Sequence, residues 1–168
     1  MHALDAACDV AQNLNHTLRR LRHYRTQGDW INALLDGASH FAHQSAVLAV
    51  QDGVLTLLGA RNLSLPEDLS FNLASAPGFR TAFDSNDPVI CLRTPGEVTA
   101  FFSTPEPGSR AHIFAITNGT RVAAVLFASA HPETDVNALE LIAGMASIVL
   151  DRQSNASLHA QIATPVRN

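Results

Sequence analysis

SAVLAVQDGVLTLLGAR (residues 45–61) and RAHIFAITNGTRVAAVLFASA (residues 110–130) decide the fold of this chain. Each stretch holds two apolar runs joined by a turn dipeptide, Asp52-Gly53 in the first and Asn118-Gly119 in the second. These dipeptides are favoured at the centre of type I′ turns, whose positive φ angles match the twist of the flanking strands. The sequence therefore predicts two antiparallel hairpins.

The spacing around each turn predicts which side chains share a face. In the first hairpin, Val50 should oppose Leu55, and Leu48 should oppose Leu57. The second hairpin should have one face of Ile113, Ala115, Val122, Ala124 and Leu126 and another of His112, Phe114, Ile116, Ala123, Val125 and Phe127. Because all of these faces are largely apolar, we expect helices or long loops on both sides of the sheet.

Helical patterns flank the two hairpins. The first, from Leu4 to about Arg25, has a heptad-like seam typical of a coiled coil. A second helix follows, with Asp29 as its expected N-cap, and the last helix should begin near Asp135. That last helix is apolar on nearly every side, so it must be buried on more than one. We therefore expect the terminal helices to form a dimeric helical bundle, whose interface residues would be Leu14, Leu18, Leu21, Leu139, Ile142, Ala146 and Val149.

The segment from residue 61 to 110 has no long regular pattern and holds six of the eight prolines. Within it we expect a short helix over Pro77–Phe83, a strand over Pro88–Arg93 and a second short helix over Glu97–Phe102. A connection of this length in a compact domain is usually a binding region or a lid.

Composition excludes several classes of function. The 168 residues fit one domain, and a net charge of −4 argues against a dedicated nucleic-acid binder. All 11 basic residues are arginine, which excludes lysine chemistry. With Asp5 and Asp9 near the start, no signal peptide or membrane span is expected, so we expect a cytoplasmic protein whose Cys8 and Cys91 are reduced thiols.

Several stretches together resemble a GAF domain, a small sensory module. They are SAVLAVQDGVLTLLGARN, PGFRTAFDSNDPVIC, GTRVAAVLFASA and NALELIAGMASIVLDR. The resemblance implies an α+β fold in which a central antiparallel β-sheet of five or six strands carries helices on its faces, with a pocket roofed by the loop-rich segment. The expected organisation is a dimerisation helix at 1–28, a GAF-like domain at 29–151, and a helix extension with a frayed tail at 152–168.

The motifs tied to the best-known GAF activities are absent. The asparagine-lysine pairing of cyclic-nucleotide-binding members cannot be complete in a chain without lysine. No Cys-His dipeptide occurs to attach a bilin. Cys91 has no second cysteine near it in sequence, as the free methionine sulfoxide reductases would require. The cofactor, if any, is therefore not identified by the sequence.

The candidate ligand-binding residues are Arg80, Arg93 and His112. Either arginine could pair with a ligand carboxylate or phosphate in a family-type pocket, although surface arginines of a loop explain them equally well. His112 should lie on an apolar strand face with Phe114 and Phe127, as a core histidine more often than a ligand.

For two further groups of residues, we expect a structural role and not a functional one. His40 and His43 are spaced to bind one metal ion, but no third ligand is obvious, so no metal site is predicted. Arg19, Arg20, Arg22 and Arg25 form a basic cluster, which we interpret as the solvated face of the first helix.

We expect a stand-alone, homodimeric GAF-like sensory module of bacterial type. A small molecule under the 61–110 segment would change the geometry of the terminal helices, and a separate output protein would read it. The alternative is a ligand-free scaffold whose pocket is filled by Phe79, Phe83, Phe101 and Phe102. A third possibility is a redox or metal-dependent enzyme, but no catalytic residues emerge from the sequence and none are predicted.

Overall fold

The computed structural model describes residues 2–163, with side chains for residues 2–155. Its elements are α1 (His2–Arg22), α2 (Gln27–Ala38), β1 (Ser45–Gln51), β2 (Val54–Arg61), β3 (Ser70–Asn72), the 3-10 helix η1 (Leu73–Ser75), α3 (Pro77–Ser85), β4 (Val89–Leu92), α4 (Pro95–Val98), β5 (Arg110–Asn118), β6 (Arg121–Ala130) and α5 (Val136–Ala163). The predicted tail lies outside the described residues from position 164 onward.

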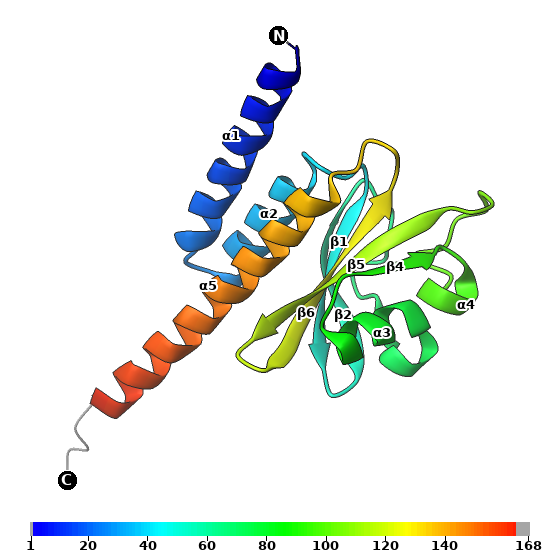
Figure 1. The fold of residues 1–168 in the computed structure, drawn as a ribbon. Helices are drawn as coiled ribbons and strands as arrows, with labels where there is room; N and C mark the ends of the chain where they lie inside the picture. Colours follow the sequence, from blue (N-terminus) through cyan, green and yellow to red (C-terminus); the bar gives the residue numbers. More distant parts are fainter. Residues whose placement is uncertain (1, 164–168) are drawn as a thin grey trace.

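The six strands form one sheet in the order β3-β2-β1-β6-β5-β4, and every neighbouring pair is antiparallel. Helices α1, α2 and α5 lie on one side of this sheet and α3 and α4 on the other (Figure 1). The prediction of a sheet covered on both faces is therefore confirmed. The first half of α1 and the last turns of α5 project beyond the rest of the molecule at opposite ends (Figure 1).

The first hairpin follows its predicted register. Asp52 and Gly53 have φ angles of 51° and 76°, as a type I′ turn requires. Val50 opposes Leu55, and Leu48 opposes Leu57. A bulge between positions 47 and 48 then shifts the pairing by one residue.

The second hairpin corrects the prediction. Its two-residue loop is Gly119-Thr120, because Asn118 pairs with Arg121. A bulge next to Ile116 inserts one residue, so Phe127 opposes Ile113 and lies on the opposite face from Phe114. A shift of one residue exchanges the two faces of a strand, and the predicted grouping of these faces was wrong for that reason.

Two helix boundaries also differ from the prediction. Helix α2 is capped by Thr26, and Asp29 is the third helical residue of a capping box in which its carboxylate accepts from the Thr26 backbone. Helix α4 ends at Val98, where the expected helix over Glu97–Phe102 would have continued. Thr99 has a φ of 69°, which stops an α-helix.

Each face of the sheet has its own core. On the α1/α2/α5 side, Trp30, Leu34, Leu126 and Ile142 are among the buried residues. On the α3/α4 side the core contains Leu55, Phe79, Phe102, Ile113 and Phe127.

The residues proposed for a dimer interface lie mostly inside one protomer. Leu21, Leu139, Ile142, Ala146 and Val149 are buried in the core between the helices and the sheet. A side chain that the protomer itself covers has no surface to offer a second subunit. Leu14 and Leu18 are half-buried. The stripe of α5 that points away from the core is instead the other one, with Leu141 and Ile148.

Candidate functional site

Phenylalanine rings fill the space where the resemblance implies a ligand pocket. The Phe79 ring centroid lies 5.5 Å from that of Phe71, 5.4 Å from that of Phe102 and 6.1 Å from that of Phe127. Phe79 and Phe102 are fully buried, whereas Phe83 is half-buried and Phe101 is exposed. Two of the four phenylalanines named as pocket fillers therefore form part of this aromatic cluster.

Arg93 contacts two residues of the aromatic cluster, Phe102 and Phe127. Its side chain is only 7% exposed, and its Nε donates to the carbonyl oxygen of Phe102 at 2.9 Å. Its Nη1 donates to Gln44 Oε1 at 2.8 Å, and the guanidinium carbon lies 5.3 Å from the centre of the Phe127 ring. Burial lowers the pKa of Arg93, with Glu106 and Cys91 acting in the opposite direction. The contacts of this guanidinium are those of a structural cross-link.

The other two candidate residues do not meet Arg93. Arg80 is exposed on α3 and pairs with Asp84 one turn later, at 3.4 Å. His112 of β5 is opposite Ala128 of β6, on the α1/α2/α5 side of the sheet. Its ring centroid lies 6.3 Å from that of Phe114. Burial lowers the pKa of His112. Arg80, Arg93 and His112 therefore do not form one site in this structure.

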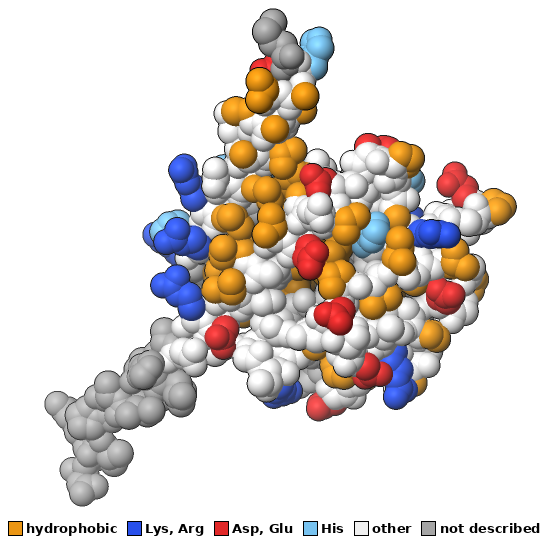
Figure 2. Space-filling view, in the orientation of Figure 1, with side chains coloured by type: hydrophobic (Ala, Val, Ile, Leu, Met, Phe, Trp, Pro, Cys, Tyr) orange, Lys and Arg blue, Asp and Glu red, His pale blue; other side chains and the backbone are white. Residues whose placement is uncertain are grey.

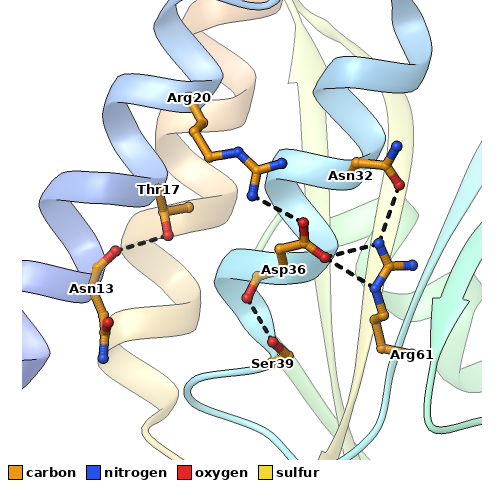
Figure 3. A network of polar contacts seen from close by, with 7 residues as sticks. All are labelled: Asn13, Thr17, Arg20, Asn32, Asp36, Ser39 and Arg61. Carbon is orange, nitrogen blue, oxygen red and sulfur yellow. Dashed lines mark hydrogen bonds and ion pairs between the residues drawn. The ribbon is translucent and has the colours of Figure 1, made fainter.

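Asp36 joins α1, α2 and β2 through a polar network that the sequence does not predict (Figure 3). Its carboxylate accepts from Arg20 of α1 at 2.9 Å and from the Nε and Nη2 of Arg61 of β2 at 3.1 and 2.8 Å. Arg61 also donates to Asn32 at 3.1 Å. We call Arg20, Asn32, Asp36 and Arg61 the Asp36 clasp. Arg20 was noticed only as one of a basic cluster, because a partner 16 residues away leaves no local pattern.

We expect Asp36→Asn to make the free energy of unfolding change less as the pH is lowered. Burial raises the pKa of Asp36, but hydrogen bonds from Arg20 and Arg61 outweigh it, so the pKa lies below the ordinary 3.8. The clasp therefore stabilises the fold above that pH and loses its effect as the pH falls through the lowered pKa. Because the side chains are over a third exposed, the loss near neutral pH should be at most about 1 kcal/mol.

Urea unfolding at a series of pH values measures this effect. The control, Asp84→Asn, removes a more exposed pair and should change the unfolding free energy by less than about 0.5 kcal/mol. Equal acid sensitivity in Asp36→Asn and the unmodified protein would contradict the role given to the clasp.

A cavity of about 340 Å³ lies where the α1–α2 linker, α5 and the sheet meet. It is lined by Tyr24, Arg25, Gln27, Trp30, Ala49, Leu58, Asn118, Ala123, Ala124, Leu150 and Gln153. Trp30 is 3% exposed, and its Nε1 is buried without a hydrogen-bond partner among the described residues. An unsatisfied buried donor of this kind costs about 1–3 kcal/mol.

Arginine side chains line this cavity and the hollow next to it. A neighbouring hollow of about 320 Å³ shares Tyr24 and Gln153 with it and is lined also by Arg22, His23, Val149 and Arg152. Neither set of lining residues contains an aspartate or a glutamate. Part of the predicted basic cluster, Arg22 and Arg25, thus borders a cavity instead of only forming a solvated helix face.

Exposed apolar residues form two short stripes on the long helices. The α5 stripe is Leu141, Gly144 and Ile148, of which Leu141 is 60% and Ile148 55% exposed. The α1 stripe is Leu4, Ala7 and Ala11, with Leu4 77% exposed. Figure 2 shows hydrophobic side chains gathered along both helices on this face of the molecule.

The remaining reactive side chains do not assemble. Cys8 is exposed and Cys91 is buried, and burial together with Glu97 raises the pKa of the Cys91 thiol to about 11. The ring centroid of His43 lies 6.0 Å from that of His131, edge to face, and that of His40 lies 6.2 Å from that of Phe41. Within residues 2–155, no three histidine, cysteine, aspartate or glutamate side chains are grouped to hold a metal ion. No helix in the described part of the chain is long and apolar enough to cross a membrane.

Comparison with known proteins identifies the fold. No protein-family profile matches the sequence, and no curated protein matches it. Among solved structures, the GAF domain of a phosphoenolpyruvate-protein phosphotransferase from Coxiella burnetii superposes with a TM-score of 0.67 at 12% identity, over 94% of this chain and 99% of that one. The GAF domain of the Acinetobacter phosphoenolpyruvate-protein phosphotransferase gives 0.63 at 12% identity, over 94% and 97%.

A chromophore-binding structure is also similar. The chromophore-binding domain of an R. palustris bacteriophytochrome gives a TM-score of 0.64 at 14% identity, over 92% of this chain and 63% of that one. At such identities the comparison shows the fold alone. The chain has the GAF domain fold that the sequence resemblance indicated.

Proposed function

We propose that this chain is a homodimeric regulatory module of the GAF type, in which a small molecule changes the relative placement of α1 and α5. Proteins with this fold in the comparisons include a sensor histidine kinase domain and the chromophore-binding domain of a phytochrome. The fold supports a sensory class of function, and the features of this chain's own helices support the mode of signalling.

The exposed α5 stripe is the observation that carries the proposal. Leu141, Gly144 and Ile148 recur at spacings of three and four residues on one side of α5, and the protomer leaves them uncovered. Large exposed apolar side chains at helical spacing are typical of a helix-helix interface. In the proposed dimer, α5 packs against α5 of the partner, and the α1 stripe extends the contact into a four-helix arrangement.

The Asp36 clasp gives this dimer a way to transmit a signal. It ties α1 through Arg20 to α2, and through Arg61 to the sheet. A change in the position of the α1–α2 linker would therefore move α1 relative to α5. A separate output protein would read that change, since helix displacement is a common form of switching.

Charged substitutions on the α5 stripe test the dimer. We expect Leu141→Glu with Ile148→Glu to convert a dimer into a folded monomer, because each carboxylate would be desolvated and face its own copy across the interface. Sedimentation velocity measures the mass, and circular dichroism confirms the fold. The matched control, Gln51→Glu with Ser64→Glu, adds the same charge at exposed sites away from the helices and should remain a dimer. An unmodified protein that is monomeric at micromolar concentration would refute the proposal.

A ligand-free scaffold is the second candidate, and the aromatic cluster favours it. Phe71, Phe79, Phe102 and Phe127 occupy the α3/α4 side of the sheet, where the resemblance implies a pocket. A dimer that binds no small molecule would support the scaffold. The two candidates share the helical interface and differ only in the ligand.

A further inference from the structure

The cavity beside Trp30 lies on the opposite side of the sheet from the aromatic cluster. Its walls include Arg25 of the α1–α2 linker, Trp30 of α2 and Leu150 of α5. The sheet contributes residues such as Ala49 of β1, Leu58 of β2 and Ala124 of β6. A molecule held here would touch both the linker that follows α1 and the middle of α5. It would therefore act on α5 directly and on α1 through the linker.

The lining has the composition of a binding site for an amphiphilic anion. Ala49, Leu58 and Leu150 are among the apolar residues of its lining. Arg25 is at one edge, and the ion pairs of the described residues do not include it. The carboxylate of Asp29 accepts from the backbone N–H groups of Arg25 and Thr26, which lower its pKa, and the Arg25 charge is near enough to lower that pKa further. Because these hydrogen bonds come from the backbone, the Arg25 guanidinium can still bind a ligand carboxylate with two parallel hydrogen bonds.

Trp30 supplies the second, independent observation. Its Nε1 is a buried donor with no partner in the described structure, although buried indole N–H groups nearly always find one. A ligand oxygen would satisfy it. Because Nε1 is buried in this conformation, its pairing with a ligand involves a rearrangement of the lining, and such a rearrangement would itself change the α1–α2 linker.

We infer that this cavity binds a small molecule with an apolar body and a carboxylate, whose oxygens accept hydrogen bonds from Arg25 and from Trp30 Nε1. The inference rests on the proposed regulatory function and gives it a ligand class and a site. The volume of about 340 Å³ is at the small end of the range for ligand pockets and suits a molecule the size of a medium-chain fatty acid or a bicyclic aromatic acid.

Trp30 is the only tryptophan in the chain, so its indole N–H gives a single resonance that reports on the site. We would titrate the 168-residue protein with octanoate, 1-octanol and octylammonium, which have the same alkyl chain and differ in head group. Octanoate should move the indole proton downfield and bind about tenfold more tightly than 1-octanol, with octylammonium weakest. No shift with octanoate at millimolar concentration would overturn the inference.

Three variants locate the binding. Arg25→Gln, at an exposed position, should remove the preference for octanoate over 1-octanol, whereas Arg19→Gln, an exposed arginine that does not line the cavity, should keep it. Ala49→Met should fill the cavity and abolish binding of all three probes. A dispersed amide spectrum shows that each variant is folded. Binding that survives both Arg25→Gln and Ala49→Met unchanged would place the probe elsewhere and overturn the site.

The result separates the site from the proposed function. If octanoate does not bind but sedimentation shows a dimer, the ligand site is wrong and the scaffold candidate gains support. If octanoate binds a protein that is monomeric, the site stands and the dimeric mode of signalling fails. If octanoate binds the dimer and changes amide exchange in α1, both stand.

Discussion

Phe79→Ala should reduce the free energy of unfolding by about 3–5 kcal/mol. Phe79 is fully buried and its ring contacts three other phenylalanine rings, so truncation removes a large apolar side chain and leaves a cavity among rigid neighbours. The neighbours belong to β3, β6 and the segment after α4, and these cannot close together without moving the sheet. The cost should therefore be near the upper part of the range for core substitutions.

The matched control is Phe101→Ala. Phe101 is the neighbour of Phe102 in sequence but is 51% exposed, so its truncation should cost less than about 1 kcal/mol. Urea unfolding followed by far-ultraviolet circular dichroism measures both variants at one protein concentration, because a dimer's stability depends on concentration. Equal losses for the two substitutions would show that the aromatic cluster is not the packed core described here.

Phe79→Ala also tests the scaffold candidate. The substitution opens space on the α3/α4 side of the sheet, where the GAF resemblance implies a pocket. If a filled pocket is what prevents binding there, the variant should bind small apolar molecules such as benzene, as engineered apolar cavities do. A variant that binds none of them and loses less stability than predicted would mean that the cavity collapses.

The sequence was most informative where the pattern is local. The positive φ angles of Asp52 and Gly53 and the pairing of Val50 with Leu55 follow from turn chemistry and alternation, and both are found. The resemblance to the GAF fold rests partly on the same hairpins and partly on PGFRTAFDSNDPVIC and the closing helix NALELIAGMASIVLDR. The second hairpin shows the limit of this reasoning, because a bulge at Ile116 has no reliable sequence signal and it exchanges the faces of the strand beyond it.

The candidate site was less predictable because it depends on contacts between distant segments. The apolar seam of α1 and α5 was recognised, but a seam does not say whether it faces the protein's own sheet or a second subunit. Leu139 and Ile142 face the sheet, and Leu141 and Ile148 face away. Nothing in the sequence around Trp30 indicates a cavity, because an apolar residue on a helix is typical of a core position. The unpaired Nε1 of Trp30 is visible only once α2, α5 and β6 are in place.

Gly37→Val should be the second most damaging substitution, with a loss of about 3 kcal/mol. Gly37 is buried on α2 where α1 crosses it. A Cβ at this position would overlap Thr17 Cγ2 and would lie 2.6 Å from Thr17 Oγ1. Thr17 cannot easily turn away, because it is 2% exposed and its hydroxyl donates to the Asn13 carbonyl at 2.8 Å. The overlap must therefore be relieved by moving α1 away from α2.

The expected consequence is a displaced α1 on an intact sheet domain. Asp36 is the residue before Gly37, and its carboxylate pairs with Arg20 of α1. A shift of α1 would therefore also break the Arg20–Asp36 ion pair of the clasp. Hydrogen exchange should become faster in α1 while the strands keep their protection. Gly28→Val is the control on the same helix, since the nearest atom to its Cβ would be Thr26 Oγ1 at an ordinary 3.7 Å.

A second substitution distinguishes steric overlap with Thr17 from any other effect of placing valine at position 37. Thr17→Ala removes the two atoms nearest to the new side chain, Cγ2 and Oγ1, and leaves the Thr17 Cβ position at 3.0 Å. Added to Gly37→Val, it should recover part of the lost stability and of the α1 protection, which is the coupling expected for residues in direct contact. If α1 instead keeps full protection in Gly37→Val alone, close packing at Thr17 does not set its position. The α1–α2 contact could then not link the Trp30 cavity to the helices of the proposed dimer.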